Sequence, residues 1–251
     1  MKLNPSHKLY ARLRRDAESN YSPAAAALYR HADELGKDSD SHAGKCRIIR
    51  DISGTFTGSI TMLDLGCGTG RYFHCARNVR TLIGVDPSEN MLAQARQSVA
   101  DGSGPTVRLV RSGLHEVAFM PGTFDLVICV GVIGEWCPLD DFVLRQVAGM
   151  LNRGGSVFLT AIESRPVPQT WKRRVASALR PLLLGAPRRY VDARLLQFDI
   201  SAERARALGQ RYFEQVDISR WQSPTKRVDL HCVMRRPHSA VGNSVDRLGH
   251  R

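Results

Sequence analysis

The stretch Leu63–Gly70 reads Leu-Asp-Leu-Gly-Cys-Gly-Thr-Gly and combines one carboxylate, Asp64, with three glycines. It begins inside an apolar run, Ile60–Leu65, that we expect to form a strand. Glycine in a turn after a strand lets the backbone pass close to a ligand, because no Cβ intervenes. We expect a helix to begin after the turn and to present its free N–H groups to the same ligand.

A second carboxylate, Asp86, ends the next apolar run, about twenty residues beyond Gly66. A carboxylate in this place can accept hydrogen bonds from a ribose diol. Such charged hydrogen bonds contribute about 1.5–3 kcal/mol each. Asp64 stands two residues before Gly66, where it can engage a cationic amino-acid head group.

A dinucleotide-binding dehydrogenase is the main competitor for a glycine-rich turn of this kind. Its fingerprint is Gly-x-Gly-x-x-Gly, whereas the glycines here follow a Gly-x-Gly-x-Gly spacing and Arg71 occupies the position of the third dehydrogenase glycine. Asp64 would also repel a pyrophosphate. The pattern therefore favours a ligand that carries an ammonium and a sulfonium over one that carries two phosphates.

The elements that must position these residues follow from short apolar runs that alternate with amphipathic stretches. We expect strands at Ile60–Leu65, Leu82–Asp86, Val107–Val110, Phe124–Val130, Ser156–Ile162, Phe213–Trp221 and Val228–Met234. We expect helices at Arg71–Val79, at Ser88–Val99 with Ser88 as N-cap, at Leu139–Leu151 ended by Gly154-Gly155, and at Ser201–Gly209. Apolar strands between amphipathic helices indicate a parallel sheet covered on both faces.

The first fifty-odd residues are polar and have a helical pattern. One helix is expected over Ala24–Leu35, after a Ser22-Pro23 start, with Leu28, Ala32 and Leu35 on one face, and another over Ala43–Ile52. We therefore predict a helical cap at 1–55 and a main domain at 56–236. The main domain would carry an insert at about 163–198, and a disordered tail would follow at 237–251.

Four motifs occur in order at suitable spacing: Asp64–Gly70, Gly84–Ser88, Phe124–Cys129 and Leu151–Ser156. Together they resemble the motifs of class I S-adenosylmethionine (SAM)-dependent methyltransferases, over about residues 60–162. The resemblance implies an α/β fold with a Rossmann-like seven-stranded, mostly parallel sheet of order 3-2-1-4-5-7-6. Its last strand would be antiparallel, its helices would cover both faces, and the N-terminal helices would form a lid.

The resemblance also implies SAM as the cofactor. The residues that would bind it are Asp64, Gly66, Cys67, Gly68, Gly70, Asp86, Pro87, Met91, Ser112, Gly113, Leu114, Cys129 and Val130. In one place the chain departs from the family, which often has an aspartate after the third strand to reach the adenine amino group. Gly113 stands there, so Ser112 or the backbone around Leu114 would have to read the adenine.

Methyl transfer from a sulfonium is an in-line displacement, so the protein mainly positions the two reactants. A general base is needed only where the acceptor loses a proton, and no metal ligands are expected. Candidate catalytic residues are Glu135 after the fourth strand, Tyr21 in the lid and His74 beyond the glycine turn. For Glu135 the alternative is a partner for an arginine or the SAM pocket, and for His74 it is a plain helix residue.

A formal charge of +12 raises the question of an anionic partner. The segment from Arg165 to Phe198 holds eight basic residues against one acid, Asp192. This basic insert indicates either a solvated helix face or contact with an anionic small-molecule acceptor. We expect a small-molecule methyltransferase, with an RNA or protein methyltransferase and a non-catalytic SAM-fold protein as alternatives.

The six cysteines contain no Cys-x-x-Cys pair, so we expect all of them to be reduced thiols without a catalytic role. No stretch approaches the roughly 18 consecutive apolar residues that a membrane span needs. Lys2 and Lys8 are not followed by the apolar region of a secretory signal. We expect a cytoplasmic protein.

Overall fold

The computed structural model describes residues 5–36, 39–99, 104–117, 119–163, 198–222 and 228–238. Residues 164–197 of the basic insert and residues 239–251 of the predicted tail lie outside the described residues. The interpretations of these two segments, and the division into cap and main domain, therefore stay predictions.

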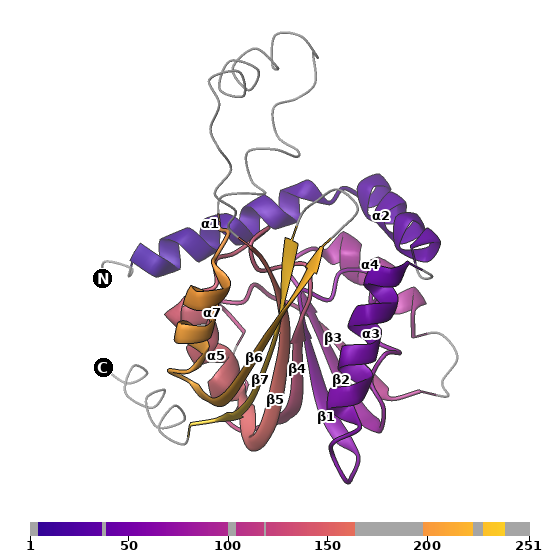
Figure 1. Ribbon diagram of the computed structural model, residues 1–251. Coiled ribbons are helices and arrows are strands. Elements are labelled where there is room, and N and C mark those ends of the chain that lie inside the picture. Colours follow the sequence, from indigo (N-terminus) through magenta and orange to yellow (C-terminus); the bar gives the residue numbers. More distant parts are fainter. Residues whose placement is uncertain are drawn as a thin grey trace.

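The centre of the molecule is a seven-stranded sheet of order β3-β2-β1-β4-β5-β7-β6 (Figure 1), as predicted. Its strands are β1 (Ile60–Leu65), β2 (Val79–Asp86), β3 (Thr106–Arg111), β4 (Phe124–Cys129), β5 (Leu151–Ile162), β6 (Phe213–Gln222) and β7 (Val228–Pro237). The pairs from β3 to β5 are parallel, and β7 runs antiparallel to both β5 and β6. The predicted antiparallel last strand is confirmed.

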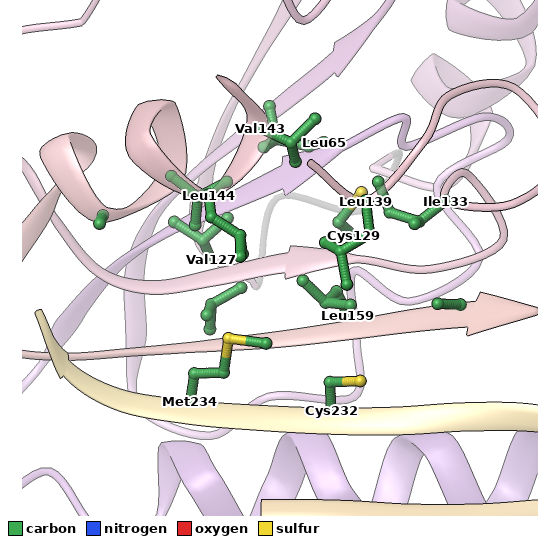
Figure 2. Packing of buried hydrophobic residues seen from close by; sticks show 14 of the residues in the cluster. Leu65, Val127, Cys129, Ile133, Leu139, Val143, Leu144, Leu159, Cys232 and Met234 are labelled. Atoms are coloured by element: carbon green, nitrogen blue, oxygen red, sulfur yellow. The ribbon is translucent and has the colours of Figure 1, made fainter. Parts of the chain in front are cut away.

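Helices cover both faces of the sheet. The described helices are α1 (Pro5–Asn20), α2 (Pro23–Leu35), α3 (Asp40–Ser53), α4 (Glu89–Gln97), α5 (Asp141–Met150) and α7 (Ala202–Gly209). Residues of α5 and α7 belong to one buried apolar cluster, and residues of α3 and α4 belong to a second. In the first cluster Val127 and Leu159 of the sheet lie between α5 and β7 (Figure 2). Helix α1 crosses above the strand ends (Figure 1).

Serine side chains fix where several helices begin, as the sequence indicated. Ser88 accepts a hydrogen bond from the Met91 N–H, and Ser22 accepts one from the Ala25 N–H. Each serine satisfies a backbone donor that has no partner within its helix. These caps anchor α4 directly after β2, and α2 directly after α1.

The prediction of a helix over Arg71–Val79 is wrong. The segment is a series of tight turns in which Phe73 N–H donates to the Gly70 carbonyl and Cys75 N–H donates to the Tyr72 carbonyl. Asn78 ends it with a φ of 57°. Tertiary contacts of these side chains override the helical pattern, and the free helix N-terminus expected beside the ligand is therefore absent from this segment.

Leu28 and Leu35, which were expected on one face of α2, are both exposed, and α2 packs through its buried residues Ala26 and Asp33. Two further expectations need correction. Gly154-Gly155 do not end a helix, since both belong to β5. Cys46 and Cys75 form a disulfide, so the prediction of six reduced thiols is wrong. The other four cysteines are free, as expected, and all four are buried.

None of the helices in the described ranges is long and apolar enough to cross a membrane.

The core of the sheet provides a test of the fold. Phe158 of β5 is completely buried among residues of α3, β1 and β4. Phe158→Ala should lower the free energy of unfolding by about 3–5 kcal/mol, because the lost ring leaves a cavity. Urea denaturation measures the change. Met120→Ala, at a side chain that is 80% exposed, is the control and should change stability by no more than about 0.5 kcal/mol. Equal losses would contradict the packing.

Candidate cofactor site

A pocket lies at the carboxyl ends of β1, β2, β3 and β4, under helix α1. Helix α1 contributes Tyr10, Leu13, Arg14 and Ala17 to its lining. The strand ends and the loops after them contribute Leu65, Gly66, Val85, Pro87, Ser112, Gly113, Leu114, His115, Cys129, Val132, Trp136 and Cys137. In parallel α/β sheets this edge is where ligands bind.

The glycine turn forms the floor of the pocket beside β1. Gly66 has a φ of 73°, and a Cβ at this residue would overlap the Val132 side chain. Gly66 and Cys67 both donate their N–H groups to the Val85 carbonyl, and Gly68 donates to Asp86 Oδ2 at 3.0 Å. Only glycine meets both the conformation and the close approach at Gly66. The turn is thereby fixed against the end of β2.

Asp64 is a buried carboxylate at the base of the site, in the β1 register between Gly84 and Ile128. It is 2% exposed, and its Oδ2 has no hydrogen-bond partner among the residues that the structure describes. Burial, together with the nearby charge of Asp86, raises the pKa of Asp64 to about 8. A buried carboxylate without a partner is costly, so this group is suited to meet a cation.

Asp86 ends β2 and is already partly engaged. Its carboxylate accepts hydrogen bonds from the Gly68 N–H at 3.0 Å and from the Ser88 N–H at 2.8 Å. Burial raises the pKa of Asp86 to about 6, although both backbone hydrogen bonds act to lower it. Its oxygens retain lone pairs beyond these two bonds, and they can accept hydroxyl donors from a ligand.

The loop after β3 closes another side of the pocket. The Ser112 hydroxyl donates to the Gly113 carbonyl at 3.2 Å, which leaves the hydroxyl oxygen able to accept. Glu116 pairs with Arg14 of α1 and accepts a hydrogen bond from the Gly113 N–H. His115 stacks on Tyr10 of α1 with ring centroids 6.3 Å apart. Helix α1 is thus tied to this loop by charge and by ring packing.

Aromatic rings gather where α1 and α2 meet the loop after β4. The Tyr21 ring lies 5.8 Å from that of Trp136 and 5.9 Å from that of Tyr29. The pKa of Tyr29 is raised to about 12, mainly by burial and also by the charges of Asp33 and Glu135. Glu135 therefore lies within electrostatic reach of this aromatic group, which borders the pocket through Trp136.

Residues 62–155 match the model of a methyltransferase domain family. This stretch contains the glycine turn and the strands β2, β3 and β4. In this stretch the chain is similar to class I SAM-dependent methyltransferases.

Two curated methyltransferases are similar to this chain over part of its length. A ubiquinone biosynthesis O-methyltransferase of Pseudomonas paraeruginosa is 34% identical over 108 residues, which are 42% of this chain and 46% of that protein. A tRNA U34 carboxymethyltransferase of Actinobacillus succinogenes is 33% identical over 109 residues, 41% of this chain and 32% of that protein. The match thus spans half the length of these relatives or less.

Among solved structures, the Burkholderia thailandensis 1,6-didemethyltoxoflavin-N1-methyltransferase, with bound 1,6-didemethyltoxoflavin and S-adenosylhomocysteine, has the same fold. Its TM-score is 0.62 at 18% identity, and the superposition covers 95% of this chain and 93% of that one.

Several of the sequence-predicted cofactor residues of this methyltransferase domain line the pocket: Gly66, Pro87, Ser112, Gly113, Leu114 and Cys129. The others surround it without belonging to the lining. Asp64, Cys67 and Asp86 are buried beneath the turn, and the Met91 side chain lies against Gly68. Gly70 has a φ of 79°, and the Phe73 ring packs against it. Val130, directly after β4, is half-buried. Their roles in binding stay predictions.

The predicted catalytic residues separate into two places. Tyr21 and Glu135 lie beside the aromatic wall of the pocket. His74 lies elsewhere, with Nε2 4.0 Å from Cys75 Sγ and its ring 6.0 Å from that of His42, and it is not among the lining residues.

Arg14 is a lining residue that was not predicted from the sequence. Its position one residue after Leu13, on the helical stripe of Tyr10, Leu13 and Ala17, could have indicated it.

Asp64 should make the stability of the ligand-free protein depend on pH. Its pKa rises from 3.8 to about 8 on folding, so between these values the folded chain binds a proton that the unfolded chain lacks. The free energy of unfolding must then fall as the pH rises through this window. Asp64→Asn should flatten the fall, most clearly between about pH 6 and 8, above the range of Asp86.

Urea denaturation at pH 5, 6, 7 and 8, without ligand, checks this expectation. Asp217→Asn is the control, because Asp217 is largely exposed and pairs with Arg235 at the surface. Parallel pH profiles for the wild type and Asp64→Asn would show that Asp64 is ionised in the folded protein.

Proposed function

We propose that this protein is a SAM-dependent methyltransferase that acts on a small-molecule acceptor. The observation that carries the proposal is Asp64 Oδ2, a buried carboxylate oxygen without a hydrogen-bond partner among the described residues, directly before the pocket-lining residues Leu65 and Gly66. A cationic ligand meets this carboxylate, whereas a dinucleotide would bring further negative charge toward Asp64 and Asp86.

The residues present fit SAM in three respects. Asp64 offers a carboxylate to an ammonium group, Asp86 offers acceptors to a ribose diol, and Ser112 offers an acceptor to an adenine amino group. Gly66 lines the pocket, and Val132 packs against it where a Cβ would stand. When bound, SAM supplies a methyl group already activated on a sulfonium. The chain therefore needs to bind, orient and shield the reactants.

On the acceptor side we place Glu135 and Tyr21, next to Trp136. Trp136 and the ring of Tyr21 offer an aromatic wall to a cation or to a planar acceptor. Glu135 would hold the acceptor or take its proton, and Tyr21 would cover it from the lid. His74 lies beside Cys75 and His42, so we assign it no catalytic role.

The similarity to an O-methyltransferase of ubiquinone biosynthesis supports a small acceptor. An anionic acceptor rests on the basic insert, most of which lies outside the described residues. A cytoplasmic location also stays a prediction of the sequence.

Transfer to RNA is the second candidate. The net charge of +12 and the similarity to a tRNA U34 carboxymethyltransferase favour it. RNA contacts would make binding fall steeply with salt, since phosphate contacts release counterions. A small-molecule acceptor would show no such loss, and this difference separates the two candidates.

We expect SAM to bind, and we expect Asp64 to release a proton when it does. Free Asp64 is largely protonated at pH 7 because its pKa is about 8, whereas an ammonium ligand requires the carboxylate. Affinity should therefore rise with pH up to about 8 and then level off. Asp64→Asn should weaken binding about 10- to 100-fold, the equivalent of one charged hydrogen bond.

Calorimetry with SAM, S-adenosylhomocysteine and NAD, in two buffers of different ionisation enthalpy, measures both effects. Binding of NAD in place of SAM would indicate a dehydrogenase. No binding of any of the three would leave a non-catalytic SAM-fold protein.

Glu135→Gln tests the acceptor side. If Glu135 holds or deprotonates the acceptor, its loss should lower kcat by about 100-fold or more and leave the affinity for SAM unchanged. Release of S-adenosylhomocysteine during a screen of amines, phenols and carboxylates provides the acceptor and the assay. Glu203→Gln, at an exposed position on α7, is the control. An equal loss of turnover and of SAM affinity would instead place Glu135 in the cofactor shell.

A further inference from the structure

Two cysteines and two histidines meet outside the pocket. His42 and Cys46 lie one turn apart on α3, and His74 and Cys75 come from the turns beyond Gly70. One ligand atom of each residue can be chosen so that all four atoms lie within 4.8 Å of one another. Cys46 and Cys75 are joined by the disulfide. The methyltransferase site uses none of these residues.

The donor set indicates the kind of metal that would fit. Thiolate and imidazole are the ligands that Zn²⁺ prefers, and the group contains no carboxylate of the kind that harder cations select. His42, Cys46 and Cys75 are buried against the apolar cluster of α3 and α4, whereas His74 is exposed. Buried sulfurs with one exposed imidazole give a closed site that a metal can enter from the side of His74.

The tautomer of His42 determines whether its ring can donate a hydrogen bond to Cys46. Arg71 donates its Nε–H to His42 Nδ1 at 3.0 Å, and an arginine does not give up its charge. Neutral His42 must then carry its proton on Nε2, which faces Cys46 Sγ at 3.4 Å. His42 is therefore a hydrogen-bond donor to this sulfur, and it stabilises a thiolate there.

We propose that the reduced protein binds one Zn²⁺ through Cys46, Cys75 and His74, with His42 donating to the Cys46 sulfur. Zn–S bonds of about 2.3 Å and Zn–N bonds of about 2.0–2.1 Å place tetrahedral ligand atoms up to about 4 Å apart. The ligand atoms of the four residues, His42 included, lie within 4.8 Å of one another, and the two sulfurs must move apart after reduction to reach this arrangement. A water molecule fills the fourth position. The proposal does not depend on methyl transfer.

The disulfide is the oxidised, metal-free form of the same site. A phosphine reductant breaks the S–S bond, gives its electron pair to the sulfurs and takes the oxygen of one water, and the two sulfurs become thiols. Zn²⁺ then displaces both thiol protons. In a reducing compartment the thiol form persists, so there the site is available to metal.

The first experiment compares the full chain in its two redox forms. Protein reduced with a phosphine and freed of metal should take up one Zn²⁺ per chain, measured by mass spectrometry of the metal and by competition with a chromophoric chelator. Its midpoint of thermal unfolding should rise on binding. The oxidised protein should bind no Zn²⁺. Co²⁺ in place of Zn²⁺ should give the near-ultraviolet charge-transfer band of a cobalt–thiolate bond.

Variants assign the ligands. Cys46→Ser, Cys75→Ser and His74→Ala should each lose tight binding, and His74→Ala should fold normally because the side chain is exposed. His42→Ala should weaken binding by about 10- to 100-fold, as loss of a group that orients a ligand does. Matched controls are Cys232→Ala, a buried cysteine of the other apolar cluster, and His31→Ala, an exposed histidine of α2. Both should bind Zn²⁺ as the wild type does.

Reduced wild-type protein that takes up no Zn²⁺ would overturn the proposal. So would binding that survives in both cysteine variants, since the metal would then be held elsewhere. Loss of binding in His42→Ala together with retention in His74→Ala would overturn the assignment of His74 as the ligand.

Discussion

The site is organised around two carboxylates that stand buried at the ends of neighbouring strands. Asp64 of β1 and Asp86 of β2 each have a pKa raised chiefly by burial, and the charge of Asp86 also raises that of Asp64. Burial of two carboxylates lowers the stability of a fold unless other groups compensate their charge. Gly68 and Ser88 do so for Asp86 through their N–H groups, but one oxygen of Asp64 has no partner in the described part of the chain. The protein thus keeps, at a cost in stability, a place that a cation completes.

The lid is held by contacts between residues far apart in sequence. Tyr10 of α1 donates its hydroxyl to Asp140, the residue that also caps α5, and Arg14 pairs with Glu116 after β3. The first of these pairs is buried in part and the second is largely exposed. Exposed ion pairs contribute only about 0–1 kcal/mol, so α1 is fastened by its buried face of Tyr10, Leu13 and Ala17.

Sequence reasoning succeeded where local pattern and structure coincide. The apolar run Ile60–Leu65 became β1 without a change of bounds, and Ser88 capped α4, because strand burial and helix capping depend on neighbouring residues. It failed at Arg71–Val79, where partners distant in sequence decide. Phe73 packs over Gly70 and Gly84, and Cys75 joins Cys46 across 29 residues. The lining residue Arg14 was missed for the same reason, since its partner Glu116 lies 102 residues away.

One guanidinium connects the parts that local pattern could not relate. Arg71 donates to Asp33 of α2 at 2.8 Å, to the Gly36 carbonyl at 3.0 Å and to His42 of α3 at 3.0 Å. Asp33 in turn accepts a 2.6 Å hydrogen bond from Thr69 within the glycine turn. Burial raises the pKa of Asp33, and the hydrogen bond of Thr69 and the charge of Arg71 oppose this rise. The carboxylate, the glycine turn and the histidine beside Cys46 therefore share one hydrogen-bonded network. A dehydrogenase fingerprint would place a glycine where Arg71 stands, and this network could not then form.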